Sequence, residues 1–432
     1  MNIALLILTI MSCGLSFIWI KEKLQNNQYD LLQTNIFGTI LTLSLYGTTY
    51  LLSTFTGLGT WIVLSILVFV WTVINIKYQV KLPKTSWYFE TRWSLLLLAS
   101  VLTFIFQHQK WGGWDAYSIW NMHAKFMFDQ ENWQNMFNST IEWTHPDYPL
   151  LLPSIIAAFW KTMGHITPVI PASFALFVYI CINSLIYNKI KKLPYISILV
   201  LTTLFLGYDY GNIASSEYAD SFIALVFLIV IILFLEKPKH YLILAGLFCG
   251  IALSIKNEGF VIYIVILIFT FFKAKYHTKS VLTVGLASLP FLLILLSFKW
   301  FLAPANDIVS GQSITTLESI LSPMRYFHII RFGLETLFTK YYMLLIIVIL
   351  SYKYWTAWHA EYWVIIMILM AYLAVYVITP KDLIWHLSTS MKRLFHHLYP
   401  ALLYLILSST DLKKWDESLE TFYYKLFGRK SS

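Results

Sequence analysis

Charged residues and cysteines are scarce in this chain. Only 12% of its 432 residues are charged, about half the share of a typical soluble domain, while 58% are hydrophobic. The three cysteines, Cys13, Cys181 and Cys249, all lie inside apolar runs, so the sequence indicates neither a disulfide framework nor a zinc site. It also contains no tandem repeat, no low-complexity linker and no segment with the composition of a soluble domain. These absences argue against a soluble globular protein of any class.

The sequence consists instead of apolar runs long enough to cross a bilayer, which takes about 20 residues in a helix. In lipid every backbone polar group must be paired within the protein, so these runs are expected to be α-helices. We therefore predict an all-α, polytopic transmembrane protein with about 13 spanning helices. The expected spans lie near 2–20, 35–55, 59–77, 93–107, 168–187, 194–208, 218–235, 241–256, 259–272, 281–303, 341–352, 362–379 and 396–408.

The basic residues predict how these helices are oriented. Lysine and arginine number 31 against 22 acidic residues, and they cluster in alternate loops between the apolar runs. Such loops tend to be cytoplasmic, so the net charge of +9 indicates topology rather than nucleic-acid binding. The other loops, near 108–167, 209–217, 256–258, 304–340 and 380–395, are then expected outside the cytoplasm. This orientation requires that the proline-flanked stretch 150–164 form a helix along the outer membrane surface instead of a span.

Acidic residues stand at two places in these expected outer loops. Asp115 follows a span closely, where a carboxylate can orient an acceptor hydroxyl or accept its proton, or can simply cap the helix that begins at Ala116. Glu217 and Asp220 are three residues apart and share a face at the outer end of a predicted helix. They could bind an acceptor or ligate a divalent cation, or could be favoured there only by the helix dipole.

Basic residues stand in the same loops. Lys256 interrupts an apolar stretch of about thirty residues, where an ionisable group suggests a function. It could hold a phosphate as a point charge, or it could merely be neutralised by Glu258. His145 precedes Asp147 and Tyr148 in a segment with two prolines, where it could donate to a phosphate or cap a turn. The spacing around His145 fits no zinc motif.

The segment 379–400 contains a polar stripe. If 383–397 is helical, steps of four, three and four residues put His386, Ser390, Arg393 and His397 on one face. Arginine offers a fork of donors that matches phosphate oxygens. A stripe of this kind could be only a solvated face, but arginine and histidine bounded by apolar residues favour an anion site.

These segments together resemble the GT-C superfamily of membrane glycosyltransferases, which includes the protein mannosyltransferases and the aminoarabinose transferase of lipid A. The segment 379–400 is similar to a pattern in bacterial glycosyltransferase-like members. Four further segments resemble, in order, the first-loop acidic motif, the proline-rich element, the second-loop acidic motif and the lysine-glycine turn. These are Trp114-Asp115, His145-Pro146-Asp147-Tyr148-Pro149, Glu217-Tyr218-Ala219-Asp220 and Lys256-Asn257-Glu258-Gly259.

The resemblance covers residues 93–400 and departs from the family at three points. More helices are expected before Asp115 than the family usually has, the first acidic motif has a single aspartate, and no large soluble domain follows the membrane region. We expect N-terminal transmembrane helices over 1–92, a GT-C-like catalytic module over 93–410 with its outer loop at 108–167, and a basic cytoplasmic tail over 411–432.

The resemblance implies a polyprenyl-phosphate sugar donor, used with inversion outside the cytoplasm, in the cytoplasmic membrane of a bacterium. The acceptor is a glycan, lipid or protein, membrane lipids surround the chain, and no nucleic acid is involved. Metal dependence stays open, since acidic pairs of this kind occur with and without a divalent cation. The expected roles are catalysis by Asp115, acceptor or metal binding by Glu217 and Asp220, donor-phosphate binding by Lys256, His386, Arg393 and His145, and support by Asp147, Tyr148, Glu258, Asp382 and Ser390.

Two other classes remain open at the level of the sequence. An O-antigen polymerase or ligase also has many helices with arginine and histidine in its outer loops. A transporter for a lipid-linked sugar would instead be expected to have discontinuous helices and polar residues at the bilayer midplane.

Overall fold

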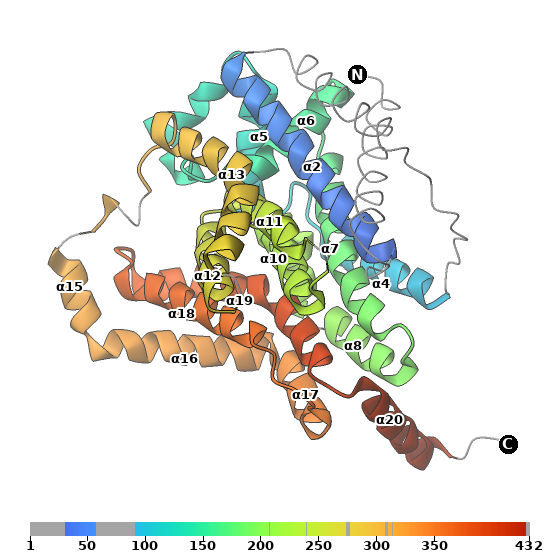
Figure 1. The fold of residues 1–432 in the computed structure, drawn as a ribbon. Coiled ribbons are helices and arrows are strands. Elements are labelled where there is room, and N and C mark those ends of the chain that lie inside the picture. Colours follow the sequence, from blue (N-terminus) through green and yellow to red (C-terminus); the bar gives the residue numbers. More distant parts are fainter. Residues whose placement is uncertain are drawn as a thin grey trace.

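The computed structural model describes residues 31–57, 91–206, 208–238, 240–273, 277–306, 310–312 and 314–428. Within these ranges all regular secondary structure is helical, apart from one isolated antiparallel bridge between Trp355 and Thr410 (Figure 1). The helices up to residue 215 are α2 (Leu31–Thr56), α4 (Thr91–Gln107), η1 (Ala116–Trp120), α5 (Asn121–Phe128), η2 (Trp133–Phe137), η3 (Ser139–Thr144), α6 (Leu151–Met163), α7 (Val169–Ile190), α8 (Pro194–Leu206) and α9 (Tyr208–Ser215). Those that follow are α10 (Ala219–Glu236), α11 (Tyr241–Ile255), α12 (Glu258–Lys273), α13 (His277–Phe301), α15 (Ile314–Leu321), α16 (Pro323–Lys340), α17 (Tyr342–Ser351), η4 (Tyr352–Tyr354), α18 (Glu361–Ile378), α19 (Leu383–Ser408) and α20 (Leu412–Phe427).

Five of the described helices are long and apolar enough to cross a membrane: α2, α7, α10, α13 and α18. The pair α16 and α17, bent by 77° at their junction, would add a sixth if it formed one span. These apolar helices indicate a helical membrane protein and agree with the expected all-α class. The expected number of about 13 spans is not confirmed. Two of the expected spans, 2–20 and 59–77, lie outside the described residues.

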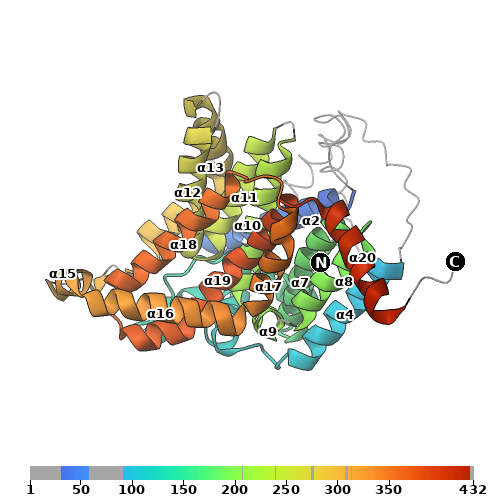
Figure 2. The ribbon, with the colours of Figure 1, turned by 90° about the horizontal axis from the view of Figure 1, so that it is seen from below.

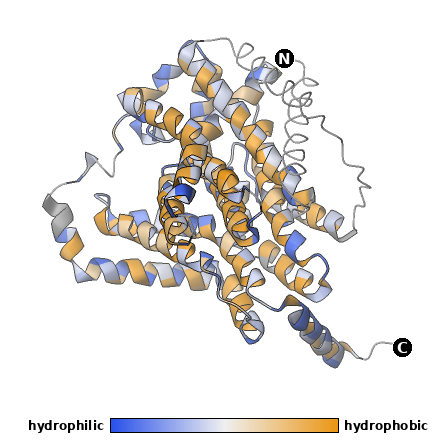
Figure 3. Ribbon diagram, in the orientation of Figure 1, coloured by the Kyte–Doolittle hydropathy of each residue, from blue (hydrophilic) through white to orange (hydrophobic). Residues whose placement is uncertain are grey.

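Helix α10 forms the centre of the bundle. It packs against α7, α11 and α19, and 89% of its 18 residues are buried (Figures 1 and 2). Neighbouring helices therefore cover almost all of α10, as a helix without a polar face allows. Helix α13 is almost as apolar, yet only 28% of its most apolar 18-residue segment is buried, which suits contact with lipid. Figure 3 shows both helices as predominantly hydrophobic ribbons, in contrast to the hydrophilic α20.

Three helices differ from the sequence-based expectation. The expected span at 396–408 is the second half of α19, a single helix of 26 residues. Its first half is too polar to be recognised as part of a span, but interior partners satisfy its polar side chains. The expected span at 341–352 is only the ten-residue α17, set at an angle to α16. The expected outer helix at 150–164 exists as α6, but α2, α5, α7 and α11 contact it and most of its residues are buried within the protein.

Several helix ends meet at one end of the bundle. Helix α10 begins there, α11 ends and α12 begins across the turn at 256–257, and α13 ends after Lys299. Helix α18 also ends there, and α19 begins there after a short connection. The loop region 108–150 covers the same end through contacts of Asp115 and Asp147. The expected outer loops are therefore brought together in space, although they are far apart in the sequence.

Candidate functional site

A fully buried carboxylate, Asp220 in the first turn of α10, is the centre of this region. Arg393 donates to its Oδ2 from both Nε and Nη2, at 3.2 and 3.0 Å. Lys256 Nζ donates to its Oδ1 at 3.1 Å, and His397 Nε2 lies 2.8 Å from the same oxygen. In a neutral His397 this arrangement leaves Nδ1 to accept from the Tyr372 hydroxyl at 3.2 Å. Asp220 thus fixes side chains from α19 and from the turn between α11 and α12.

Arg393 joins Asp220 to a second carboxylate. Its Nη2 lies 2.7 Å from Oδ2 of Asp115, and its guanidinium lies 4.8 Å from the centroid of the Tyr218 ring. The alternative of Asp115 as a helix cap is wrong, because its side chain makes no capping hydrogen bond to η1. Asp115 instead pairs with the same Arg393 nitrogen, Nη2, that also contacts Asp220.

Lys256 lies between two carboxylates. Besides Asp220, its Nζ contacts Oε1 of Glu258 at 2.9 Å. Burial alone would lower the pKa of the Lys256 ammonium, but Asp220 and Glu258 outweigh it and raise the pKa above its usual value. Glu258 is therefore only one of the two carboxylates that neutralise Lys256. An ammonium has three donors, and two carboxylates occupy two of those of Lys256.

The proline-rich segment is tied to the same turn through Asp147. Asn257 and Asn306 donate to Asp147 Oδ2 at 3.0 and 2.8 Å. Lys299, near the end of α13, donates to the backbone carbonyl of Asp147 and, at 3.0 Å, to Asn257 Oδ1. Next to Asp147, the ring of Tyr148 stacks on that of His145 with centroids 5.0 Å apart.

A cavity of about 570 Å³ opens beside these residues. Its lining includes all four residues that the sequence-based prediction assigns to a donor phosphate. The polar side chains in the lining are His145, Tyr148, Lys256, Asn257, Glu258, Lys299, Asn306, Tyr372, Tyr376, Lys381, His386, Ser390 and Arg393. The rest of the lining is apolar and comes from α11, α12, α13, α18 and α19. It consists of Leu253, Phe260, Val261, Leu292, Leu295, Leu296, Val375, Ile378 and Leu394.

The polar stripe of α19 continues along the cavity wall. His386 Nδ1 lies 3.0 Å from Thr379 Oγ1, and the Ser390 hydroxyl pairs with that of Tyr376 at 2.7 Å. Asp382 lies just before the helix and caps it by accepting from the Trp385 backbone N–H at 2.8 Å. The stripe therefore meets side chains of α18 and α10 and is no solvated face.

Glu217 has partners of its own. His108 Nε2 lies 2.6 Å from its Oε1, and Asn121 donates to its Oε2 at 3.1 Å. Burial raises the pKa of Glu217 above its usual value, against the opposing effect of these hydrogen bonds. Glu217 and Asp220 thus share no hydrogen-bond partner.

Within the described part of the chain, no three histidine, cysteine or acidic side chains are grouped so that they could hold a metal ion.

The sequence reasoning missed several cavity residues, among them Lys299, Lys381, Tyr372 and Tyr376. Lys299 carried a usable signal, because it is a lone cation at the end of an otherwise apolar run. Lys381 lies within the segment 379–400 but off its expected stripe. The two tyrosines carried no signal, since aromatic residues are common in apolar helices throughout this chain.

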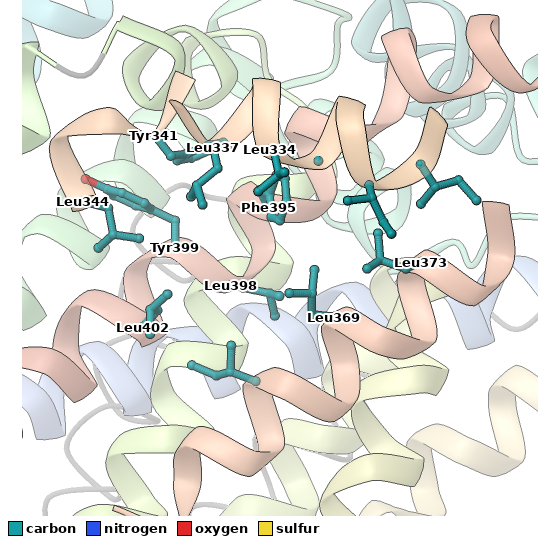
Figure 4. Close-up of a pocket in the computed structure, with 14 residues that line it drawn as sticks. Leu334, Leu337, Tyr341, Leu344, Leu369, Leu373, Phe395, Leu398, Tyr399 and Leu402 are labelled. Atoms are coloured by element: carbon teal, nitrogen blue, oxygen red, sulfur yellow. The ribbon is translucent and has the colours of Figure 1, made fainter. Parts of the chain in front are cut away.

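A second pocket, of about 350 Å³, lies between α16, α18 and α19 and reaches α17. Figure 4 shows Leu334 of α16, Leu373 of α18 and Phe395 of α19 around it. Among the described residues, no charged side chain lines this pocket. It therefore lacks the groups that would carry chemistry, and the polar cavity is the candidate site.

The tight turn that holds Lys256 depends on Gly259. A Cβ there would overlap the backbone of Ala252 in α11. We expect Gly259→Ala to lower the free energy of unfolding by about 1–3 kcal/mol, because α12 must move away from α11. Unfolding by sodium dodecyl sulfate in mixed micelles, followed by circular dichroism, measures this loss. Gly333→Ala in α16 is the matched control, because no described atom lies within 4 Å of its added Cβ, and it should not destabilise the protein. Equal stability of both variants would contradict this account of the turn.

Comparison with protein-family models, with curated proteins and with solved structures finds no match to this chain.

Proposed function

We propose that this chain is an integral membrane glycosyltransferase of the GT-C type. It transfers a sugar from a polyprenyl-phosphate-linked donor to an extracytoplasmic glycan, lipid or protein acceptor, with inversion. The observation that carries the proposal is a cavity whose lining combines lysine and arginine with many apolar side chains. A lipid phosphate has the same two-part chemistry, an anionic head and an apolar chain. The cavity volume of about 570 Å³ also lies in the range of small-molecule sites.

The proposed reaction uses these groups in one displacement. The acceptor hydroxyl attacks the anomeric carbon, the bond from that carbon to the phosphate oxygen breaks, and the electron pair leaves with the lipid phosphate. Lys256, Arg393 and His386 would stabilise the negative charge that develops on this leaving group. Asp220 holds two of these cations in place before any ligand arrives, so little reorganisation is required during the reaction.

The carboxylates take different roles in this proposal. Asp220 directs all its contacts to Arg393, Lys256 and His397, so we assign it to the positioning of cations. Asp115 also pairs with Arg393, which gives it a positioning role in addition to the catalytic role that the resemblance implies. Glu217 lies behind His108 and is not part of the cavity lining.

The same proposal includes a multi-pass topology in a bacterial cytoplasmic membrane, with the cavity facing outward. The arrangement of basic residues supports it. Lys189, Lys237 and Lys273 lie at the ends of α7, α10 and α12 that are opposite to the cavity. Positive charge at those ends favours a cytoplasmic location for them.

Release of lipid phosphate tests the proposal. Purified protein in detergent micelles, given polyprenyl-phosphate glucose, mannose and aminoarabinose with a bacterial envelope extract as acceptor, should release polyprenyl phosphate from at least one donor. Mass spectrometry of the extracted lipids measures the release together with the glycosylated product. A transporter would move the donor across a vesicle membrane without cleaving it. Protein that leaves every donor intact contradicts the proposed activity.

A further inference from the structure

Glu258 differs from the other carboxylates of the site in having an unused oxygen. Its Oε1 contacts Lys256 Nζ at 2.9 Å, but its Oε2 is buried and has no hydrogen-bond partner among the described residues. A buried carboxylate oxygen without a donor costs free energy, and native structures rarely leave one unexplained. Glu258 also lines the polar cavity. A ligand that brings a hydroxyl to this oxygen would satisfy it.

The neighbouring carboxylates do not offer such an oxygen to the cavity. Asp220 is fully buried with both oxygens bonded, and Asp115, whose Oδ2 pairs with Arg393 at 2.7 Å, does not line the cavity. Asp147 Oδ2 accepts from two asparagine side chains. Within the part of the chain that the structure describes, Glu258 is the one carboxylate in the cavity lining.

We infer that Glu258 is the general base that takes the proton of the acceptor hydroxyl, an inference that rests on the proposed glycosyl transfer. The hydroxyl proton moves to Oε2 of Glu258 while the hydroxyl oxygen bonds to the anomeric carbon. The carbon–oxygen bond to the phosphate breaks, and its electron pair stays on the lipid phosphate. No further reactant is needed.

The position of Lys256 suits this role. Its contact with Oε1 favours the ionised form of Glu258 before the acceptor arrives, which a base requires. During transfer Glu258 loses one negative charge on protonation, while the lipid phosphate gains one as a diester becomes a monoester. Both changes take place in the cavity that Lys256 and Glu258 line, so the net charge beside Lys256 stays constant.

The test compares two glutamates that each begin a helix and pair with a lysine. Glu258 begins α12 beside Lys256, and Glu361 begins α18 with Lys273 Nζ 2.5 Å from its Oε1, outside the cavity lining. Glu258→Gln should lower the transfer rate about 100- to 10,000-fold, the usual contribution of a general base. It should leave the affinity for farnesyl phosphate within about threefold, because the cations that would bind the phosphate, Lys256 and Arg393, are unchanged. Glu361→Gln should retain both transfer and binding.

Each outcome decides a separate point. Transfer by Glu258→Gln within tenfold of wild type overturns the assignment of the base but leaves the proposed function intact. Parallel loss of farnesyl phosphate binding also overturns it, because Glu258 would then only position Lys256. If Glu258→Gln does not fold, Glu258→Asp is the second variant, because it retains the charge beside Lys256 and withdraws the reacting oxygen. It should bind farnesyl phosphate normally and transfer the sugar slowly. Normal transfer by Glu258→Asp overturns the inference. Wild-type protein that neither binds farnesyl phosphate nor cleaves a donor overturns the proposed function itself.

Discussion

Replacing Asp220 by asparagine is expected to lower the free energy of unfolding by about 3–5 kcal/mol, the usual cost of leaving a buried charge without its partner. The variant retains the shape of the side chain but removes the negative charge. Lys256 and Arg393 then face each other across a fully buried position, each with one carboxylate fewer. Unfolding by sodium dodecyl sulfate in mixed micelles, followed by circular dichroism, gives the difference in free energy.

The control for this variant is Asp382→Asn. Asp382 caps α19 through its side chain, and asparagine caps helices about as well, so stability should change by less than about 0.5 kcal/mol. An Asp220→Asn protein as stable as the Asp382→Asn protein would contradict the central position of Asp220. It would mean that Lys256 and Arg393 are adequately neutralised by Glu258 and Asp115 alone.

The stability of this network and its proposed function are linked. The network joins six ionisable side chains, those of Asp115, Asp220, Lys256, Glu258, Arg393 and His397. Such a network is a costly way to hold a bundle together, because each charged group loses its hydration. Replacement of such groups by apolar residues often stabilises a protein. The network is therefore better understood as a means of keeping cations fixed at the cavity wall than as a source of stability.

The sequence predicted local features of this site well. The spacing of His386, Ser390 and Arg393 places them on one face of α19, and the structure has a helix there whose stripe meets protein and the cavity. Helix periodicity depends only on neighbours a few residues apart, so a single sequence contains it. The apolar runs predicted most of the described helices for the same reason.

The sequence did not predict which residues far apart in the chain contact each other. Asp220 and Arg393 are separated by 173 residues, and neither pattern nor composition specifies that they pair. The local pattern around Asp115 suggested a helix cap, but in the structure its side chain pairs with the distant Arg393. Glu258 beside Lys256 looked like simple neutralisation, because an unused oxygen can be recognised only once all surrounding donors are placed.

The start of α19 illustrates a related limit. A span was expected only from residue 396, because a hydropathy pattern treats polar residues as the end of a membrane helix. In the structure the helix begins at Leu383, since Asp220, Tyr376 and Thr379 supply partners for its polar side chains. Tertiary partners thus extend a helix where composition alone would end it.

Arg393→Ala is expected to remove most of the preference of the cavity for a phosphate. Wild-type protein should bind farnesyl phosphate about 100-fold more tightly than farnesol, because hydrogen bonds to a charged group contribute about 1.5–3 kcal/mol. Arg393 lines the cavity, and with its Nε and Nη2 held by carboxylates its Nη1 is the nitrogen that can donate to a phosphate oxygen. Arg393→Lys retains the charge but not the fork, so an intermediate preference is expected, and it serves as the second variant if alanine impairs folding.

Arg331→Ala provides the matched control, because Arg331 is an exposed arginine on α16 and does not line the cavity. The most direct test of the account is therefore the ratio of the affinities for farnesyl phosphate and farnesol, measured by isothermal titration calorimetry in nanodiscs. The account predicts a ratio of about 100 for wild type and Arg331→Ala and a ratio below about 10 for Arg393→Ala. Equal affinity of the wild-type protein for both lipids, or an unchanged ratio in Arg393→Ala, would contradict the claim that this cavity binds a lipid phosphate.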